Sequence, residues 1–365
     1  MRLVPTKFID PGAELADDLF TLDGKVLLKK GSKLTSVLIE RINSNNIFSI
    51  YIKDEHSPGE IQRLVDPVLR HKGYELVKRI FDAVGNRKPD GTSMPLSIMS
   101  LNDELNKLME EILYEMTGIK DKQLEYIDVK NTRSYIYSSA FNTALLSVLI
   151  GWEMGLSADF IRQLFVGGIY HDIGMMMAPE EVLYKKEALT MEDKKHIIMH
   201  PVVGHSYLKN QVFLSAYVKA IAYQHHENLD GTGYPNRLKG EEIHLLSQIV
   251  GLADIYDAMT SDRPYRPAIS VSETVEYIMA NAGTKYSLEV VTAFVKKINP
   301  YPEGSLIRLN NGKTAVVRSV PKEMPLRPLV EIIEKGSDGS YRYEEVDLQK
   351  EHRLLIEKMV FRLDE

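Results

Sequence analysis

The chain has 365 residues, of which 44% are hydrophobic and 26% charged, a composition typical of a globular protein with two or three domains. Its 45 basic and 51 acidic side chains give a formal charge of −6 without any basic block, so we expect no duplex nucleic-acid partner. The absence of cysteine excludes disulfides and thiolate metal sites. We find neither a signal-peptide core nor an apolar run long enough to span a membrane, and therefore expect a cytoplasmic protein without a membrane span.

Residues 1–55 are expected to form a small β-rich module. Two strand-like runs, at 19–22 and 25–29, flank an Asp-Gly pair, which is a strong hairpin signal. A short helix is expected over 35–43 and a closing strand over 48–52. We interpret the module as a packing or partner-binding element in preference to a ligand sensor, because nothing in it carries chemistry.

Residues 56–130 have a helical pattern. Apolar residues recur with a spacing near 3.6 over 61–84, and again over 105–116. We interpret this region as a helical linker that packs on the domain that follows. Its exposed face is a candidate homodimer surface, although ordinary core helices are the favoured interpretation.

Residues 131–298 are expected to form a helical bundle. Its first helix is predicted over 135–153, and Ser157 is placed to cap the second. Thr190 to Asp193 has the pattern of a capping box, which opens a short helix predicted to end near His200.

Residues 299–365 return to strand signals, with runs at 305–309, 314–317 and 329–333 joined by turn residues. We expect an antiparallel β-cap here and assign no catalysis to it.

Histidines and carboxylates end several of the predicted bundle helices. Val218, Ile221, Ala222 and His225 share one helix face, and His226 lies about 100° further round. A single histidine on such a face is more often a hydrogen-bonded core residue than a ligand. Partners at other helix ends favour a metal site, because imidazole and carboxylate are the ligands that suit Fe, Mn, Zn or Ni. The candidate ligands are His171, Asp172, His200, His225, His226 and Asp254, with Asp172 as the natural bridge between two cations.

The ordered motifs in this region resemble those of the HD-GYP family, bacterial metal-dependent phosphodiesterases that hydrolyse cyclic di-GMP. The similarity extends from Asn131 to Lys297. It is carried by His171-Asp172-Ile173-Gly174, His200-Pro201, His225-His226-Glu227, Asp230-Gly231-Thr232-Gly233-Tyr234-Pro235 and Asp254-Ile255-Tyr256-Asp257-Ala258. The resemblance implies a mainly α fold, in which an HD-type bundle is flanked by the β-rich module and the β-cap. It also implies hydrolysis of cyclic di-GMP to linear pGpG, with further cleavage to GMP left open.

The resemblance further implies the roles of individual residues. One metal would be held by His171, Asp172 and Asp254, and the other by Asp172, His200, His225 and His226, with Asp172 as the catalytic bridge. One or two Fe or Mn ions are favoured over Zn or Ni, and a GGDEF-type or other signalling protein is an expected partner. The candidate substrate contacts are Gly233, Tyr234, Arg263 and Arg266. For each arginine, a surface ion pair is as well supported as a phosphate contact. Tyr234 either stacks on guanine or closes its loop.

Two positions depart from the family pattern. Ser139 stands where the family has a histidine ligand, and Met175 stands where it usually has a lysine near the substrate phosphate. The alternative hypothesis is therefore a degenerate domain that binds cyclic di-GMP or a protein partner without turnover. Action on another phosphoester is a third, less favoured hypothesis.

Overall fold

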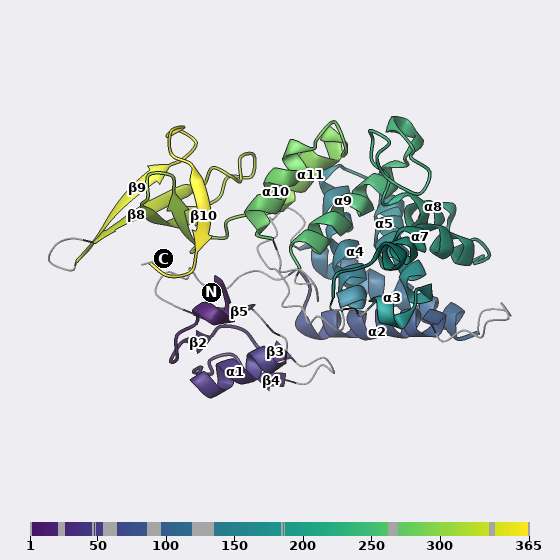
Figure 1. Ribbon diagram of the computed structural model, residues 1–365, viewed down its shortest axis with the longest axis horizontal. Helices are drawn as coiled ribbons and strands as arrows, with labels where there is room; N and C mark the ends of the chain where they lie inside the picture. Colours follow the sequence, from purple (N-terminus) through teal and green to yellow (C-terminus); the bar gives the residue numbers. More distant parts are fainter. Residues whose placement is uncertain are drawn as a thin grey trace. The chain divides into compact units, whose positions relative to one another are not determined.

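The structure is a computed structural model in which residues 2–20, 26–45, 47, 49–53, 64–85, 96–118, 135–183, 185, 187–261, 269–335 and 340–363 are described (Figure 1). The chain divides into two compact units. The β unit comprises Met1–Arg63, Gln123–Asn131 and Ile298–Glu365, and the helical unit comprises Leu64–Lys122 and Thr132–Lys297.

The N-terminal part of the β unit contains two small antiparallel sheets and one helix. The first sheet has the order β1 (Arg2–Pro5), β5 (Ser49–Lys53) and β2 (Glu14–Leu15), and the second pairs β3 (Leu19–Phe20) with β4 (Val26–Leu28). The short 3₁₀ turn η1 (Thr6–Phe8) follows β1 in the chain, and the helix α1 (Ser36–Ser44), whose first turn is capped by the Thr35 hydroxyl, follows β4. The predicted hairpin strands and helix are confirmed, while the Asp-Gly turn itself lies outside the described residues.

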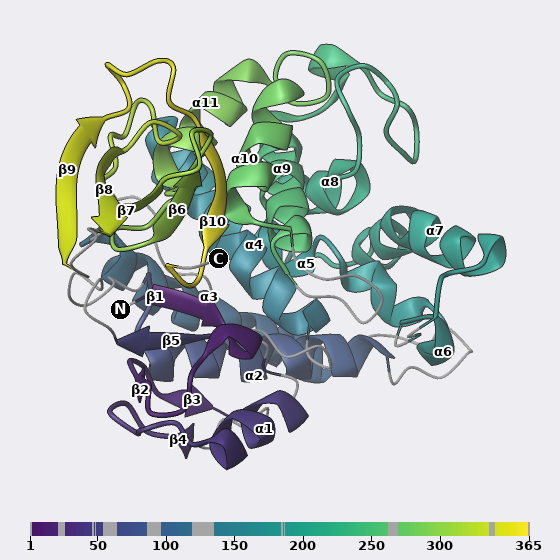
Figure 2. The ribbon, with the colours of Figure 1, turned by 60° about the vertical axis from the view of Figure 1, so that its left-hand side comes forward.

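The C-terminal part of the β unit is a five-stranded antiparallel sheet, which confirms the predicted β-cap (Figure 2). Its order is β10 (Ile356–Val360), β6 (Leu306–Leu309), β7 (Thr314–Ser319), β8 (Leu329–Lys335) and β9 (Tyr341–Asp347). Alternate residues of the central strands form its core, among them Ile307, Ala315 and Val330. The ends of the chain meet in this unit, because the Phe8 ring stacks on Phe361 with centroids 5.1 Å apart.

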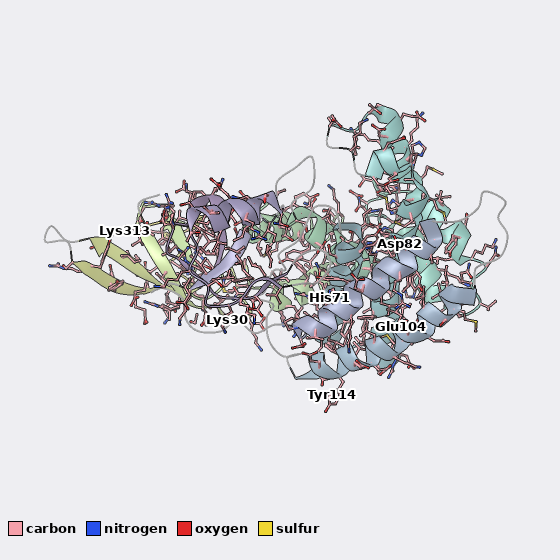
Figure 3. The ribbon with its side chains drawn as sticks, turned by 90° about the horizontal axis from the view of Figure 1, so that it is seen from below. Lys30, His71, Asp82, Glu104, Tyr114 and Lys313 are labelled. Atoms are coloured by element: carbon pink, nitrogen blue, oxygen red, sulfur yellow. The ribbon has the colours of Figure 1, made fainter. Side chains whose placement is uncertain are left out.

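In the helical unit, α2 (Pro67–Gly85) and α3 (Leu96–Thr117) lie side by side along one side of the bundle (Figures 1 and 3). Pro67 is the first residue of α2, a position where its missing N–H costs no helical hydrogen bond. Arg79 of α2 pairs with Glu104 of α3 at 2.8 Å, and the Tyr137 hydroxyl donates to Asp82 at 3.1 Å. Figure 3 shows Tyr114 of α3 pointing away from the pair, and its side chain is 82% exposed.

The bundle itself is built from α4 (Tyr135–Glu153), α5 (Ala158–Tyr170), α7 (Met191–Leu208), α8 (Ala216–Gln224) and α9 (Leu245–Met259). Shorter elements connect or cover them: η2 (Ile173–Met177), α6 (Glu180–Leu183), η3 (Gly240–Glu242), α10 (Val271–Ala280) and α11 (Leu288–Lys297). The helix α4 is apolar on nearly all sides and packs against α5 and α9, so it forms the centre of the unit. The mainly helical fold is thereby confirmed.

The predicted caps are present, but one predicted helix end is wrong. Ser157 accepts a hydrogen bond from the Phe160 N–H, and Thr190 with Asp193 forms a capping box. However, α7 does not end near His200, because it continues through Pro201 to Leu208. None of the helices in the described part of the chain is both long enough and apolar enough to cross a membrane.

Candidate metal centre

Six side chains from four helices converge in the helical unit. His171 and His225 occupy the C-terminal caps of α5 and α8, His226 follows His225, and His200 and Asp254 lie within α7 and α9. Asp172 opens η2 directly after His171. Two sets of donor atoms each lie within 4.8 Å of one another. We call Asp172, His200, His225 and His226 the four-residue group, and His171, His225 and Asp254 the three-residue group.

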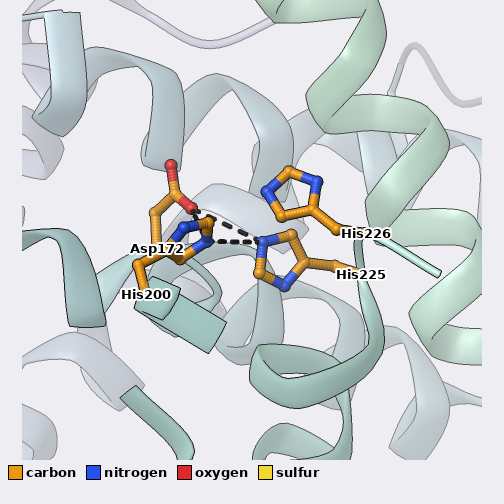
Figure 4. Close-up of side chains that lie close together, drawn as sticks. All are labelled: Asp172, His200, His225 and His226. Carbon is orange, nitrogen blue, oxygen red and sulfur yellow. Dashed lines mark hydrogen bonds and ion pairs between the residues drawn. The ribbon is translucent and has the colours of Figure 1, made fainter. Parts of the chain in front are cut away.

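Figure 4 shows that the side chains of the four-residue group point toward one another. Asp172 belongs to the four-residue group and also approaches His171 of the three-residue group. Its Oδ1 atom is 3.0 Å from His200 Nε2 and 3.5 Å from His225 Nε2, whereas its Oδ2 atom is 3.6 Å from His171 Nε2. Asp254 Oδ1 approaches the same His171 nitrogen to 3.5 Å. One carboxylate thus offers an oxygen to each group.

Three of the imidazoles are oriented by backbone carbonyl groups. The Nδ1 atoms of His171, His200 and His225 lie 2.7 Å from Gly168 O, 2.6 Å from Ile197 O and 3.1 Å from Ile221 O. A carbonyl only accepts hydrogen bonds, so each Nδ1 carries a proton and each Nε2 faces the cluster. Histidines that bind metals are held by such contacts, which fix the tautomer.

The sequence His200-Pro201 explains one of these contacts. Pro201 has no N–H, so within α7 it leaves the carbonyl of Ile197, four residues earlier, without its helical donor. The Nδ1–H group of His200 donates a hydrogen bond to that carbonyl instead. The proline therefore creates the acceptor that aims His200 Nε2 at Asp172.

The ligand atoms of the cluster are suited to binding a cation and cannot all hydrogen-bond to one another. His200 Nε2 and His225 Nε2 are 3.2 Å apart, and when both carry their protons on Nδ1 these two atoms are acceptors that cannot bond. The buried atoms His171 Nε2 and Asp172 Oδ1 have no hydrogen-bond partner among the described residues. Buried polar atoms are normally satisfied, so the cluster has the chemistry of a divalent metal site.

The two groups differ in charge. Burial opposes the charge of His171, but the Asp172 and Asp254 carboxylates outweigh it and raise the pKa of His171 to about 9. Burial likewise opposes the charge of Asp254, and the nearby His171 nonetheless lowers the pKa of Asp254 to about 2. In the four-residue group, burial lowers the pKa of His225 and holds the pKa of His226 well below its usual value.

Two glycines allow the backbone to approach these histidines. A Cβ at Gly174 would lie 2.1 Å from the carbonyl oxygen of His200, so η2 can contact α7 there only with glycine. A Cβ at Gly233 would lie 2.4 Å from the carbonyl oxygen of His226. Gly233 is thus required for close approach of the loop after α8.

That loop is fixed by a buried carboxylate that the sequence analysis did not single out. Glu227 accepts hydrogen bonds from the N–H groups of Asn236, at 2.7 Å, and Leu238, at 3.0 Å. Tyr234 stacks on the His226 ring with centroids 4.7 Å apart. The Tyr234 ring therefore contacts a candidate ligand, and its expected contact with guanine stays a prediction.

The departures from the family pattern have defined surroundings. Ser139 is buried, and its hydroxyl donates to Asp257 Oδ2 at 2.7 Å. Met175 is buried in η2. Arg263 and Arg266 lie in the segment 262–268, outside the described residues, so their expected phosphate contacts remain predictions.

Comparison with known proteins agrees with this geometry. Residues 124–290 match the HD domain family, and residues 306–363 match the family described as a KOW domain associated with HD domain. Residues 124–290, which include all six candidate ligands, are therefore similar to HD domains, and the C-terminal sheet is similar to the KOW domains that accompany them. The match is consistent with the resemblance of the motifs between Asn131 and Lys297 to the HD-GYP family.

Several characterised relatives are similar over part of their length. A cyclic di-GMP phosphodiesterase of Pseudomonas aeruginosa is 32% identical over 62% of this chain and 54% of that protein. A cyclic di-GMP phosphodiesterase of Thermotoga maritima is 35% identical over 51% of this chain and 50% of that protein. A 3'3'-cGAMP-specific phosphodiesterase of Vibrio cholerae is 34% identical over 44% of this chain and 37% of that protein. The chain spans about half the length of the first two relatives.

Proposed function

We propose that this protein is a metal-dependent phosphodiesterase that opens cyclic di-GMP to linear pGpG. The proposal rests on imidazole nitrogens and carboxylate oxygens that converge without being able to hydrogen-bond to one another. His200 Nε2 and His225 Nε2 are an example, because both are acceptors. The names of the relatives support cyclic di-GMP as the substrate.

In this proposal Asp172, His200, His225 and His226 would hold one divalent ion, and His171, Asp172 and Asp254 would hold a second. His225 would serve only the first ion, because its Nδ1 atom is engaged by Ile221 O and a single nitrogen remains. Iron or manganese suits such a set of nitrogen and oxygen donors. Bound ions would activate water and neutralise charge on the phosphate. The protein orients the imidazoles through backbone carbonyls, as at His200, and packs Tyr234 against His226. Arg263 and Arg266 are proposed to contact substrate phosphates.

The alternative, a domain that binds cyclic di-GMP or a protein partner without turnover, is motivated by Ser139 and Met175. Ser139 donates its proton to Asp257, and a neutral thioether occupies position 175. An absent cationic donor that supplies ~3 kcal/mol corresponds to a rate roughly a hundredfold lower. These substitutions are compatible with slow turnover as well as with none.

The deciding experiment measures metal content per chain by elemental analysis and cyclic di-GMP turnover on the same sample. Two metals per chain with linear product support the phosphodiesterase. One metal or none, with saturable binding and no turnover, would overturn it in favour of the alternative. The double variant Ser139→His with Met175→Lys should raise turnover if both departures slow the reaction, and Met176→Lys serves as its neighbouring control.

The same proposal places the protein in the cytoplasm, with a homodimer through α2 and α3 and a GGDEF-type or other signalling partner. Tyr114 lies exposed on the outward face of α3, where a substitution can test this surface. Loss of a dimer in Tyr114→Glu, measured by light scattering, would support this assignment, and an unchanged mass would contradict it.

A further inference from the structure

A cavity of about 210 Å³ opens between η2 and α7, next to the metal centre. Met177 lines it from the end of η2, and four residues of α7 line its other side: Lys195, His196, Met199 and Val203. His200 also lines this cavity, while its Nε2 atom lies 3.0 Å from Asp172 Oδ1. The cavity and the donor cluster therefore share one residue as a common wall.

A nucleotide would extend from one of these sites into the other. One ribose carries the base at C1′ and the phosphates at C3′ and C5′, so the base lies about one sugar away from the phosphate. A phosphate at the cluster would therefore leave its base close to the wall formed by His200. Of the six candidate ligands, only His200 lines this cavity.

The size and the apolar lining of the cavity suit an aromatic base. A cavity of about 150 Å³ accommodates a six-membered aromatic ring, and this one is larger and open to solvent. Met177 and Met199 keep 38% and 47% of their surface exposed. Thioether side chains adapt to flat rings and make favourable contacts with them.

Lys195 gives the cavity a preference between bases. Its ammonium group pairs with Glu192 at 2.7 Å, and both side chains are about 70% exposed, so this pair is readily exchanged for another acceptor. Guanine presents two acceptors, N7 and O6, whereas adenine presents one acceptor and the N6 donor. An ammonium group only donates, and therefore matches guanine.

We propose that the cavity between η2 and α7 is a base-binding subsite in which Lys195 selects guanine over adenine. This inference rests on the proposed function, since it assigns a part of the same substrate. It makes Lys195 a specificity-determining residue that does not contact the reacting phosphate.

The test compares Lys195→Ala with Lys194→Ala, a neighbouring exposed lysine of α7 that does not line the cavity. Affinities of the metal-loaded protein for cyclic di-GMP and cyclic di-AMP are measured by equilibrium dialysis, and KM and kcat on the same samples. Lys195→Ala should reduce the preference for cyclic di-GMP about tenfold, through affinity and KM with little change in kcat. Lys195→Glu should shift the preference toward the adenine ligand, because a carboxylate accepts from N6.

The outcomes separate the subsite from the activity. Equal preferences in Lys195→Ala, Lys194→Ala and the parent protein would overturn the subsite even if hydrolysis proceeds. A change of preference confined to the Lys195 variants would support the subsite even if no hydrolysis is detected, and in that case only the proposed activity fails. Absence of binding of either ligand to the parent protein would overturn the subsite.

Discussion

The four-residue group and the three-residue group share His225 and differ in what competes with a cation for their donor atoms. In the three-residue group, His171 and Asp254 lie 3.5 Å apart and stabilise each other's charged forms. In the four-residue group, burial disfavours a charge on His225 and on His226. A proton on His171 therefore competes with metal at the three-residue group, whereas burial favours the neutral form of His225 and His226 in the four-residue group.

The number of ligands alone does not determine which of two positions binds a metal more tightly. Ligands must be neutral imidazole or ionised carboxylate before they bind, so a stable internal ion pair weakens a site that has the correct residues. Ser139 stands where the family has a histidine ligand, and its hydroxyl donates to Asp257. We expect the four-residue group to bind the tighter ion.

The largest effect is expected from Asp172→Ala, which should weaken metal binding at both groups. Asp172 offers Oδ1 to the four-residue group and Oδ2 to His171. Metal content should fall toward zero, and turnover should fall by more than a hundredfold, since bound metal supplies several kcal/mol. Elemental analysis and turnover check this, with Asp159→Ala on the surface of α5 as the control. Retention of two metals would contradict a bridging role.

A smaller, asymmetric effect is expected from removing one ligand at a time. Asp254→Asn should leave the four-residue group intact, so one tightly bound metal per chain should remain. His226→Ala should instead weaken that tight ion, by at least the roughly tenfold to hundredfold seen for residues that only support ligands. Competition with a metal chelator measures the affinity of each ion. Equal retention of the tight ion in both variants would show that the two groups are not separate sites.

The number of protons released on metal binding distinguishes the two groups without a mutation. With a pKa of about 9, His171 is protonated at pH 7 in the metal-free protein, and it must lose that proton to become a ligand. Filling the three-residue group should therefore release about one proton at pH 7, and its affinity should rise as pH increases toward 9. His225 and His226, whose pKa values are lowered, release none at that pH.

Calorimetric titration of metal in two buffers of different ionisation enthalpy measures the number of released protons. In Asp254→Asn the pKa of His171 should fall, and the released fraction should fall with it. Identical heats in both buffers would contradict the raised pKa of His171.

The sequence predicted those features that depend on neighbouring residues. Helix α4 begins and ends at the predicted Tyr135 and Glu153, and Ser157 and Thr190 act as caps as expected. Each of these depends on local periodicity or on a hydroxyl three residues from its partner N–H. The convergence of the six candidate ligands was implied by the resemblance, because no spacing within the chain fixes which helix ends meet.

Several other features were missed, for different reasons. Helix α7 continues through Pro201 because a side chain, that of His200, fills the carbonyl that the proline leaves free. Strand β9 was missed because its residues are mostly exposed and polar, without the alternation that marks a strand. The cavity beside Lys195 requires η2 and α7 to pack together, and no local pattern indicates that packing.

The smallest effect is expected from Glu227→Gln, which tests whether the loop after α8 supports the four-residue group. Glu227 accepts hydrogen bonds from the backbone N–H groups of Asn236 and Leu238, and in the loop between Glu227 and Asn236 the Tyr234 ring stacks on His226. Glutamine keeps the shape but loses the negative charge, and its amide N–H₂ cannot accept the second bond. Hydrogen bonds to charged groups contribute about 1.5–3 kcal/mol, so thermal stability should fall modestly.

If the loop holds His226 in place, the same variant should also lower the affinity of the tight ion by a few fold and leave the three-residue group unaffected. Glu241→Gln, an exposed residue of η3, serves as the control for the loss of a charge. Lower stability with an unchanged affinity for the tight ion would mean that the loop is anchored for other reasons. The geometry of the four-residue group would then be fixed by the backbone carbonyls that orient His200 and His225.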